Sequence, residues 1–366
     1  MNSDHRVVLT LDAGGTSFRF SAMRGGVAVS NTIVLPSNGD DLQACLKSIV
    51  EGFRQVEAKC PAPPVAISFA FPGPADYPKG IIGDLNNLPA FRGGIALGPM
   101  LEEKFGIPVF INNDGDLFAY GEAIAGLLPH INDLLEKVGS PKRFKNLIGV
   151  TLGTGFGGGI VRAGELFLGD NSLSGEVWLL RNKVDPKMNA EEGACIRAVR
   201  RVYAQQAGIP FQSAPDPKTI AQIAHGPKSP SQEAAMEAYR GLGEVVGDAL
   251  GQVLTLLDGL VVIGGGISGG HKLFLPPLVA ELNSHYQQPN GNKLRRLASK
   301  VFNFEDAEQL ADFLKGETRE IVVPGSQRKI CYDPLPRLGV GISRLGTSEA
   351  VAIGAYAFAL KKLDQC

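Results

Sequence analysis

Residues 10–18 read TLDAGGTSF, in which a short apolar strand enters a glycine turn and a second apolar strand leaves it. Residues 151–159 read TLGTGFGGG and have the same layout. Glycine permits positive φ angles and close approach, so that several backbone N–H groups can point at one phosphate. Either turn alone is equally well interpreted as an ordinary β-hairpin. Because the same device opens each half of the chain, the pair favours two related domains that bind a polyphosphate.

Around these turns, strand-like and helix-like segments alternate, which is typical of an α/β protein. Predicted strands cover 7–11, 18–23, 27–35, 65–71, 109–111, 146–152, 157–161 and 260–263, and predicted helices cover 42–53, 115–138, 191–206, 231–257 and 347–360. A length of 366 residues suggests about two domains. We expect an N-terminal domain over 1–135, completed by a C-terminal helix at about 346–366, and a second domain over 136–345 with an insertion at about 284–336.

Composition excludes several classes of function. Lys and Arg number 36 against 37 Asp and Glu, so the chain lacks the broad basic field that a nucleic-acid or anionic-membrane binder needs. No run approaches the ~20 apolar residues of a membrane helix, and no secretory leader is evident at the N-terminus. The five cysteines are scattered without a CxxC pair, which indicates reduced thiols. We therefore expect a soluble cytoplasmic protein that binds neither nucleic acid nor membrane.

Polar residues that can bind a ligand or act in catalysis follow two of the predicted strands. Asp12 can hold a magnesium-bound water, and the Thr16 hydroxyl can reach a phosphate oxygen. Asn113 and Asp114 lie where a strand gives way to a helix, which is where α/β sheets gather their ligands. Asp114 in this place is either a helix cap or a general base beside an amide that can bind a substrate hydroxyl. The three glycines at 264–266 form either a turn that binds a nucleoside or an ordinary tight turn.

Taken together, these segments resemble the ROK family of sugar kinases and sugar-responsive repressors, in the actin-like ATPase superfamily. The matching motifs occur in family order, span nearly the whole chain and read DAGGT at 12–16, FPGP at 71–74, NLP at 87–89, NDGD at 113–116, LGTGFGGG at 152–159, SGE at 174–176 and GGG at 264–266. The resemblance implies two actin-like (ribonuclease H-like) α/β domains with an active-site cleft between them. It also implies ATP-dependent phosphorylation of a hexose or N-acetylhexosamine, most often at the C6 hydroxyl.

The resemblance assigns roles residue by residue. Asp114 takes the position of the catalytic base. The matched sugar-binding positions are Gly73, Asn87, Asn113, Asp114 and Glu176, with Glu192 at the place of a further family glutamate for which Glu191 competes. The matched nucleotide-binding positions are Asp12, Gly14, Gly15 and Thr16 in the first phosphate turn, Thr154 and Gly155 in the second, and Gly265 at the nucleoside. The implied cofactors are ATP and magnesium, the latter through Asp12, and the implied assembly is a homodimer.

The chain departs from the family pattern in three places. Leu179 stands where many members have a histidine, and 182–194 lack the cysteines of the family's zinc motif, so we expect no zinc site. Asp116 stands where asparagine is frequent. Asp116 can raise the proton affinity of Asp114 by like-charge repulsion or point into solvent, and we expect solvent.

Two other functions remain open at this stage. One is a sugar-binding protein without catalysis, which the altered region around Leu179 suggests. The other is a sugar-responsive transcriptional regulator, although only eleven residues precede Asp12 and the helix-turn-helix domain of family repressors is missing. The sequence does not determine which sugar is bound, because that choice depends on the detailed shape of the pocket.

Overall fold

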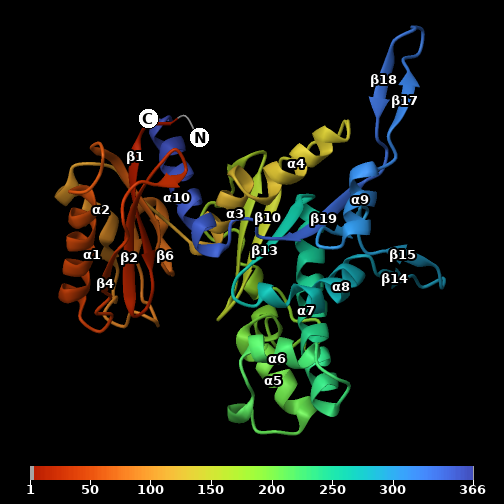
Figure 1. Ribbon diagram of the computed structural model, residues 1–366, viewed down its shortest axis with the longest axis horizontal. Helices are drawn as coiled ribbons and strands as arrows, with labels where there is room; N and C mark the ends of the chain where they lie inside the picture. Colours follow the sequence, from red (N-terminus) through yellow and green to blue (C-terminus); the bar gives the residue numbers. More distant parts are fainter. Residues whose placement is uncertain (1–3, 366) are drawn as a thin grey trace. The chain divides into compact units, whose positions relative to one another are not determined.

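The computed structural model describes residues 4–365, and the chain divides into two compact units. Unit 1 consists of Met1–Ala125, Glu165–Gly175 and Leu345–Cys366, and unit 2 of Gly126–Gly164 and Glu176–Arg344 (Figure 1). The sequence-based boundary at 135 falls inside helix α4 (Leu127–Lys137) of unit 2. The short segment Glu165–Gly175, which includes β12 (Glu165–Leu166), belongs to unit 1 and had no counterpart in the predicted division.

Unit 1 is built on a six-stranded sheet with the order β3-β2-β1-β5-β9, in which β4 also pairs with β2. Strand β1 is antiparallel to β2 and parallel to β5, and β5 is parallel to β9. The strands are β1 (Val7–Ala13), β2 (Ser17–Arg24), β3 (Val27–Ala28), β4 (Ile33–Pro36), β5 (Pro64–Ala70) and β9 (Val109–Asn112). The strand predicted over 27–35 is interrupted, because the Ser30 hydroxyl accepts a hydrogen bond from the Ala22 N–H (2.9 Å) in place of a backbone carbonyl of a regular strand pair.

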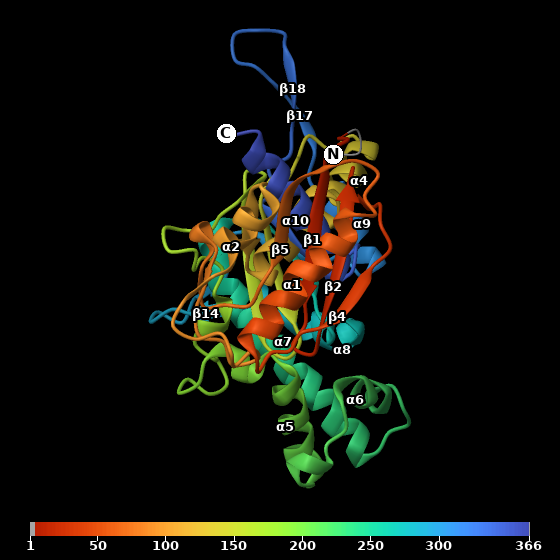
Figure 2. The same cartoon turned by 90° about the vertical axis from the view of Figure 1, so that its left-hand side faces the viewer.

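Helices cover both faces of this sheet (Figures 1 and 2). Alternate residues of β1 point to opposite sides, since the side-chain period of a strand is two. Leu9 packs in the core formed with Phe53 of α1 (Leu42–Glu57), whereas Val8 packs with Ile353 and Tyr356 of α10 (Thr347–Leu363). The C-terminal helix thus completes one of the two cores of unit 1. The remaining elements are β6 (Ala75–Asp76), β7 (Ile81–Ile82), β8 (Ile95–Ala96) and α2 (Leu97–Phe105).

Helix α3 (Asp114–Ile124) crosses α10 at two glycines. A Cβ atom on Gly121 would overlap the carbonyl of Ala350, and one on Gly354 would overlap the carbonyl of Leu117. The single helix predicted over 115–138 is wrong: α3 ends at Ile124 and a separate helix, α4, starts at Leu127. The periodicity of the apolar residues continues across this break, which is why the sequence did not reveal it.

Unit 2 repeats the same plan. Its sheet contains β11-β10-β13-β19-β16 in that order, with β10 antiparallel to β11 and the later pairs parallel. The strands are β10 (Leu147–Leu152), β11 (Phe156–Arg162), β13 (Leu260–Gly264), β16 (Lys300–Asn303) and β19 (Arg337–Ile342), and the packed helices are α5 (Ile196–Ala207), α6 (Pro217–Ala224), α7 (Pro230–Leu257) and α8 (His271–Leu282). The helix predicted over 191–206 begins only at Ile196, as α5, and a separate 3-10 turn covers Ala190–Gly193.

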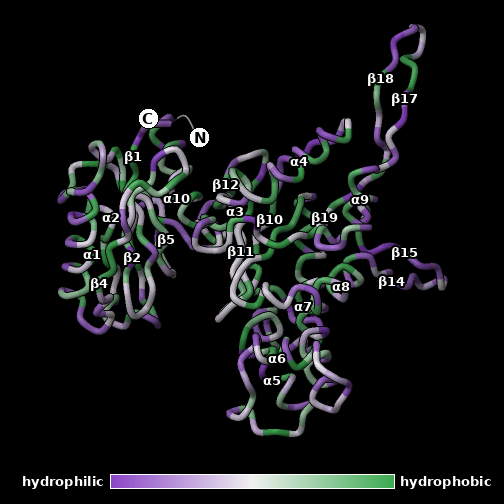
Figure 3. The backbone as a smooth tube through the Cα atoms, viewed as in Figure 1, coloured by the Kyte–Doolittle hydropathy of each residue, from purple (hydrophilic) through white to green (hydrophobic). Residues whose placement is uncertain are grey.

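The segment expected as an insertion at 284–336 is only partly one. Strand β16 lies inside it and pairs with β19, so it belongs to the central sheet. Around β16 lie α9 (Ala307–Lys315) and two hairpins, β14 (His285–Gln287) with β15 (Lys293–Arg295) and β17 (Arg319–Val322) with β18 (Lys329–Tyr332). The β14–β15 hairpin is mostly hydrophilic (Figure 3). Within residues 4–365, no helix is long and apolar enough to cross a membrane.

Candidate active site

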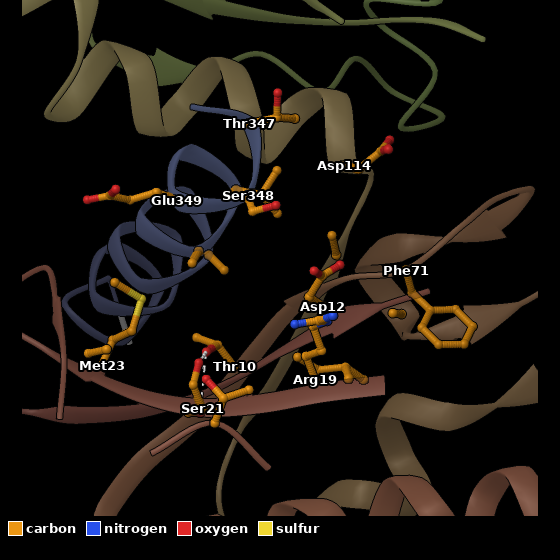
Figure 4. Close-up of a pocket in the computed structure, with 18 of the residues that line it drawn as sticks. Thr10, Asp12, Arg19, Ser21, Met23, Phe71, Asp114, Thr347, Ser348 and Glu349 are labelled. Atoms are coloured by element: carbon orange, nitrogen blue, oxygen red, sulfur yellow. Dashed lines mark hydrogen bonds between the residues drawn. The ribbon is translucent and has the colours of Figure 1, made fainter. Parts of the chain in front are cut away.

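Unit 1 contains a cavity of about 720 Å³ at the carboxyl ends of β1, β5 and β9 (Figure 4). These three strands are parallel to one another, so the residues that follow them meet at one edge of the sheet. Among the lining residues are five that the sequence singled out, namely Asp12, Gly73, Asn87, Asn113 and Asp114. We call this space the unit 1 cavity. Other residues in its wall include Thr10, Arg19, Ser21, Met23, Phe71, Thr347, Ser348 and Glu349.

The first glycine turn closes on itself at the rim of this region. The Gly14 N–H donates to the Ser17 carbonyl (3.1 Å), and the Ser37 hydroxyl donates to the Gly15 carbonyl (2.6 Å). Gly14 and Gly15 do not have positive φ, so the first of the two expected reasons for glycine does not apply here. Gly14 is instead required by close approach, since a Cβ would lie 2.8 Å from the Ser17 carbonyl oxygen. Gly15 and Thr16 are exposed.

Asp114 is the first residue of α3, and Asn113 rather than Asp114 is the cap of that helix. The Gly115 N–H donates to Asn113 Oδ1 (2.7 Å) and to Asp114 Oδ1 (2.8 Å). Asp114 is open to the cavity, but the protein around it desolvates the carboxylate and raises its pKa. The Asp12 charge raises this pKa further, and the hydrogen bond from the Gly115 N–H lowers it. A carboxylate that is oriented by one backbone N–H and has a raised pKa is suited to accept a proton.

Asp116 does not point into solvent as expected, because it is only 2% exposed. The physical reason is that α3 is buried on all sides from Gly115 to Ala123, so this helix has no face in contact with water. The like charge that acts on the pKa of Asp114 is that of Asp12.

Arg19 is a candidate site residue that the sequence reasoning missed. It is the cross-strand partner of Asp12 in the β1–β2 pair, and it is exposed. Figure 4 shows its guanidinium group beside the Asp12 carboxylate. The available signal was the alternation of β2: Phe18 and Phe20 are buried, so Arg19 between them faces the other side of the strand, together with Asp12.

The second glycine turn lies in unit 2 between β10 and β11. It is closed by the Gly153 N–H, which donates to the Gly155 carbonyl (3.0 Å). The Glu191 carboxylate accepts the Phe156 N–H (3.1 Å), and Arg197 donates to the Thr154 carbonyl (3.1 Å). The competing residue, Glu191, therefore contacts this turn directly.

Glu192, the residue assigned by resemblance, has a different environment. Its carboxylate is bound by Arg201 (2.9 Å) and Arg197 (3.0 Å), and hydrogen bonds from these two side chains lower its pKa. Glu176, the other predicted sugar ligand in unit 2, accepts a hydrogen bond from the Trp178 indole N–H.

Gly265 follows β13 and lies against the end of β10. Its φ is +89°, and a Cβ would overlap the backbone of Leu152. The Ile267 N–H also donates to the Leu152 carbonyl (3.0 Å). The second glycine turn and the predicted nucleoside turn thus occupy adjacent carboxyl ends in one sheet. Across residues 4–365, no group of three or more His, Cys, Asp or Glu side chains is arranged to hold a metal ion.

Two α/β units, each opening with an antiparallel hairpin and continuing with parallel strands, define the two-domain actin-like ATPase fold. The chain belongs to the ROK family, whose family model matches residues 8–307. This confirms the fold and the family that were expected from the motifs.

Named relatives agree with this membership. A solved glucokinase from Parabacteroides distasonis is 53% identical and superposes with a TM-score of 0.90, covering 98% of this chain and 99% of that one. An N-acetyl-D-glucosamine kinase from Photobacterium profundum is 28% identical over 290 residues, which is 74% of this chain and 88% of that protein. A ROK glucokinase from Streptomyces griseus, solved with glucose and AMPPNP, shares the fold at 19% identity and a TM-score of 0.60, covering 96% and 98%. The names support the expected class of enzyme, an ATP-dependent sugar kinase.

Proposed function

We propose that this protein phosphorylates a hexose or an N-acetylhexosamine at its C6 hydroxyl, with ATP as the donor. The observation that carries the proposal is the pair of carboxylates in the unit 1 cavity. Asp114 has a raised pKa and is held by a backbone N–H, and Asp12 lies at the end of the parallel strand β1, which β5 separates from the strand β9 that precedes Asp114. The cavity volume of about 720 Å³ is in the range of sites that hold a small molecule.

In the proposed reaction, Asp114 accepts the proton of the sugar hydroxyl as its oxygen attacks the γ-phosphorus. The new bond joins that oxygen to phosphorus, the bond to the bridging oxygen breaks, and ADP leaves. The raised pKa makes Asp114 a stronger base than an ordinary aspartate. The Oδ1 of Asn113 is held by Gly115, so its Nδ2 is left to donate to a sugar oxygen. We assign Gly73 and Asn87 to the same sugar.

The proposed phosphate position lies at Asp12, Gly14, Gly15 and Thr16. The exposed Asp12 carboxylate is the type of oxygen ligand that Mg²⁺ prefers, and Mg²⁺ usually takes one or two carboxylates together with phosphate oxygens. Bound magnesium would neutralise charge on the phosphates. The Arg19 guanidinium beside Asp12 supplies a second, permanent positive charge.

In unit 2, we assign Thr154, Gly155 and Gly265 to the nucleotide. This assignment is supported by the family match and by the adjacency of the two turns at the ends of β10 and β13. Glu176 is assigned to the sugar, and either Glu191 or Glu192 contributes a further carboxylate. The contact between Glu191 and the turn favours Glu191.

We also propose that the protein works in the cytoplasm as a homodimer. Support for the compartment comes from Cys45, Cys60, Cys195 and Cys331, which are all free thiols. Light scattering after size-exclusion chromatography tests the assembly: a mass of twice the 38.8 kDa chain is expected, and the mass of a single chain contradicts it.

The function is tested with purified protein, ATP, Mg²⁺ and a panel of hexoses and N-acetylhexosamines, by following ADP release. Turnover is expected with at least one sugar, and the product should carry phosphate on C6 by NMR. The matching 6-deoxy sugar should bind without turnover. Sugar binding by calorimetry with no ADP release on any sugar would identify a non-catalytic binding protein and refute the proposal.

A further inference from the structure

A second cavity, of about 570 Å³, lies in unit 2 at the opposite edge of the sheet from the nucleotide turns. Its wall includes Asn146, directly before β10, Asp258, shortly before β13, and Arg337, the first residue of β19. These are the amino ends of three parallel strands, whereas Gly153 and Gly265 follow their carboxyl ends. Strand β10 has six residues, which separates the two edges by about 20 Å. We call this space the basic cavity.

The charged side chains around the basic cavity are mostly cationic. Lys142, Arg143 and Lys145 come from the loop between α4 and β10, and Arg337 comes from β19. The single carboxylate in the lining is Asp258. Clustering of like charges is unfavourable unless an anion offsets it, and three cations lie within four residues of this loop.

Local hydrogen bonds hold two of the three loop cations, Lys142 and Arg143, in place. Lys142 Nζ donates to the carbonyl of Leu335, which lies in the chain between the lining residues Pro334 and Pro336. Arg143 Nη1 donates to the carbonyls of Ser140 (2.7 Å) and Lys142 (2.8 Å), and its Nη2 lies 3.7 Å from Glu136. These bonds use only some of the ammonium and guanidinium N–H donors, so others remain for a ligand.

Arg337 contributes a buried guanidinium group to the wall. Its side chain is fully buried, and Nη1 donates to Asp333, but Nε and Nη2 have no hydrogen-bond partner. Burial is the main cause that lowers the pKa of Lys142, the nearby Arg337 charge lowers it further, and the charges of Asp333 and Asp258 oppose the shift. An anion in the cavity would relieve this repulsion.

We propose that the basic cavity binds a small molecule that carries a phosphate group. A phosphate at neutral pH has close to two negative charges and three acceptor oxygens, which suits several Lys and Arg donors arriving from different sides. The volume admits inorganic phosphate or a phosphate ester the size of a sugar phosphate. The proposal does not depend on the proposed kinase function, because it concerns the opposite edge of the sheet and a different set of residues.

The test is calorimetry on the full-length protein with inorganic phosphate and, separately, with a hexose 6-phosphate. The triple variant Lys142→Gln, Arg143→Gln, Lys145→Gln should weaken binding of the preferred probe by about tenfold or more, since charge-assisted hydrogen bonds are lost. The probe that binds more tightly identifies the source of the phosphate. A matched control, Lys293→Gln with Arg295→Gln on the exposed β14–β15 hairpin of the same unit, should leave binding unchanged.

A second variant guards against misfolding. Lys145→Glu changes only an exposed residue, keeps the Lys142 and Arg143 hydrogen bonds, and should also weaken binding. Equal affinity and stoichiometry in the wild type, the triple variant and Lys145→Glu would overturn the proposal, as would an equal loss in the hairpin control. Asp114→Asn should leave this binding intact, so failure of the kinase proposal and failure of this one are distinguishable.

Discussion

Replacing Asp114 by asparagine separates chemistry from folding at the centre of the unit 1 cavity. The substitution preserves shape, and an amide oxygen can still accept the Gly115 N–H that now binds Asp114 Oδ1 at 2.8 Å. The Asn113 cap of α3 is untouched. The negative charge and the ability to accept a proton are lost. A positioned general base contributes about 10²–10⁴-fold, so kcat should fall by that factor.

The same variant should keep or gain thermal stability at neutral pH. The pKa of Asp114 is raised above 3.8 in the folded protein, so the folded state binds more protons than the unfolded state between 3.8 and the raised value. Stability then falls as pH rises through that window, and ionised Asp114 destabilises the fold at pH 7. Asparagine removes this charge. Below pH 3.8 the difference between the two proteins should vanish.

Steady-state kinetics and thermal melts at pH 7 check both expectations. Asp76→Asn is a matched control: it removes an exposed acid of unit 1 that pairs with Lys79 (2.8 Å) outside the cavity, and it should leave kcat unchanged. Activity within tenfold of wild type in Asp114→Asn would show that another group accepts the proton. A melting temperature several degrees lower at pH 7 would show that the charge stabilises the fold, against the reasoning above.

Three further results are expected. The acid limb of the kcat/KM profile should lie above pH 3.8, since Asp114 must be ionised and its pKa is raised; a limb at or below that value contradicts the assignment. Arg19→Gln should lower kcat by about 10²-fold through loss of a preorganised positive charge beside the phosphates, and unchanged kcat with a raised sugar KM would place Arg19 at the sugar instead. In urea titrations, Gly354→Ala should lower the free energy of unfolding by roughly 1–3 kcal/mol, because its Cβ meets the Leu117 carbonyl. Gly241→Ala, in open space on α7, should instead raise the free energy of unfolding by roughly 0.5–1 kcal/mol. Equal effects of the two substitutions would contradict the role assigned to close helix packing.

The fold class was predictable because it rests on local signals. The two glycine hairpins and the strand that ends at Asn112 are each encoded within about ten residues, and parallel strands bring their ends together without further information. The break between α3 and α4 was not predictable, because apolar spacing continues through Ala125 and Gly126. The burial of Asp116 also depends on helices that arrive from distant parts of the chain.

The site residues that the sequence did not predict also depend on how distant parts of the chain pack together. Arg19 is placed opposite Asp12 only by the strand register, and Glu191 contacts the second turn only because a 3-10 segment far along the chain is placed beside it. Neither placement can be recognised from a sequence motif. The strand β16, inside a region of irregular composition, joins the sheet because β19 offers it an open edge.

The contribution of α10 to unit 1 sets the timing of maturation on the ribosome. Thr347, Ser348 and Glu349 form part of the cavity wall, and Tyr356 accepts the Gly25 N–H (2.8 Å) from the opposite end of the chain. A nascent polypeptide can assemble the sheet of unit 2 while the first unit still lacks one of its covering layers. Synthesis must pass residue 363 before α10 can complete the wall around Asp12 and Asp114, so chains that end before α10 lack part of this cavity.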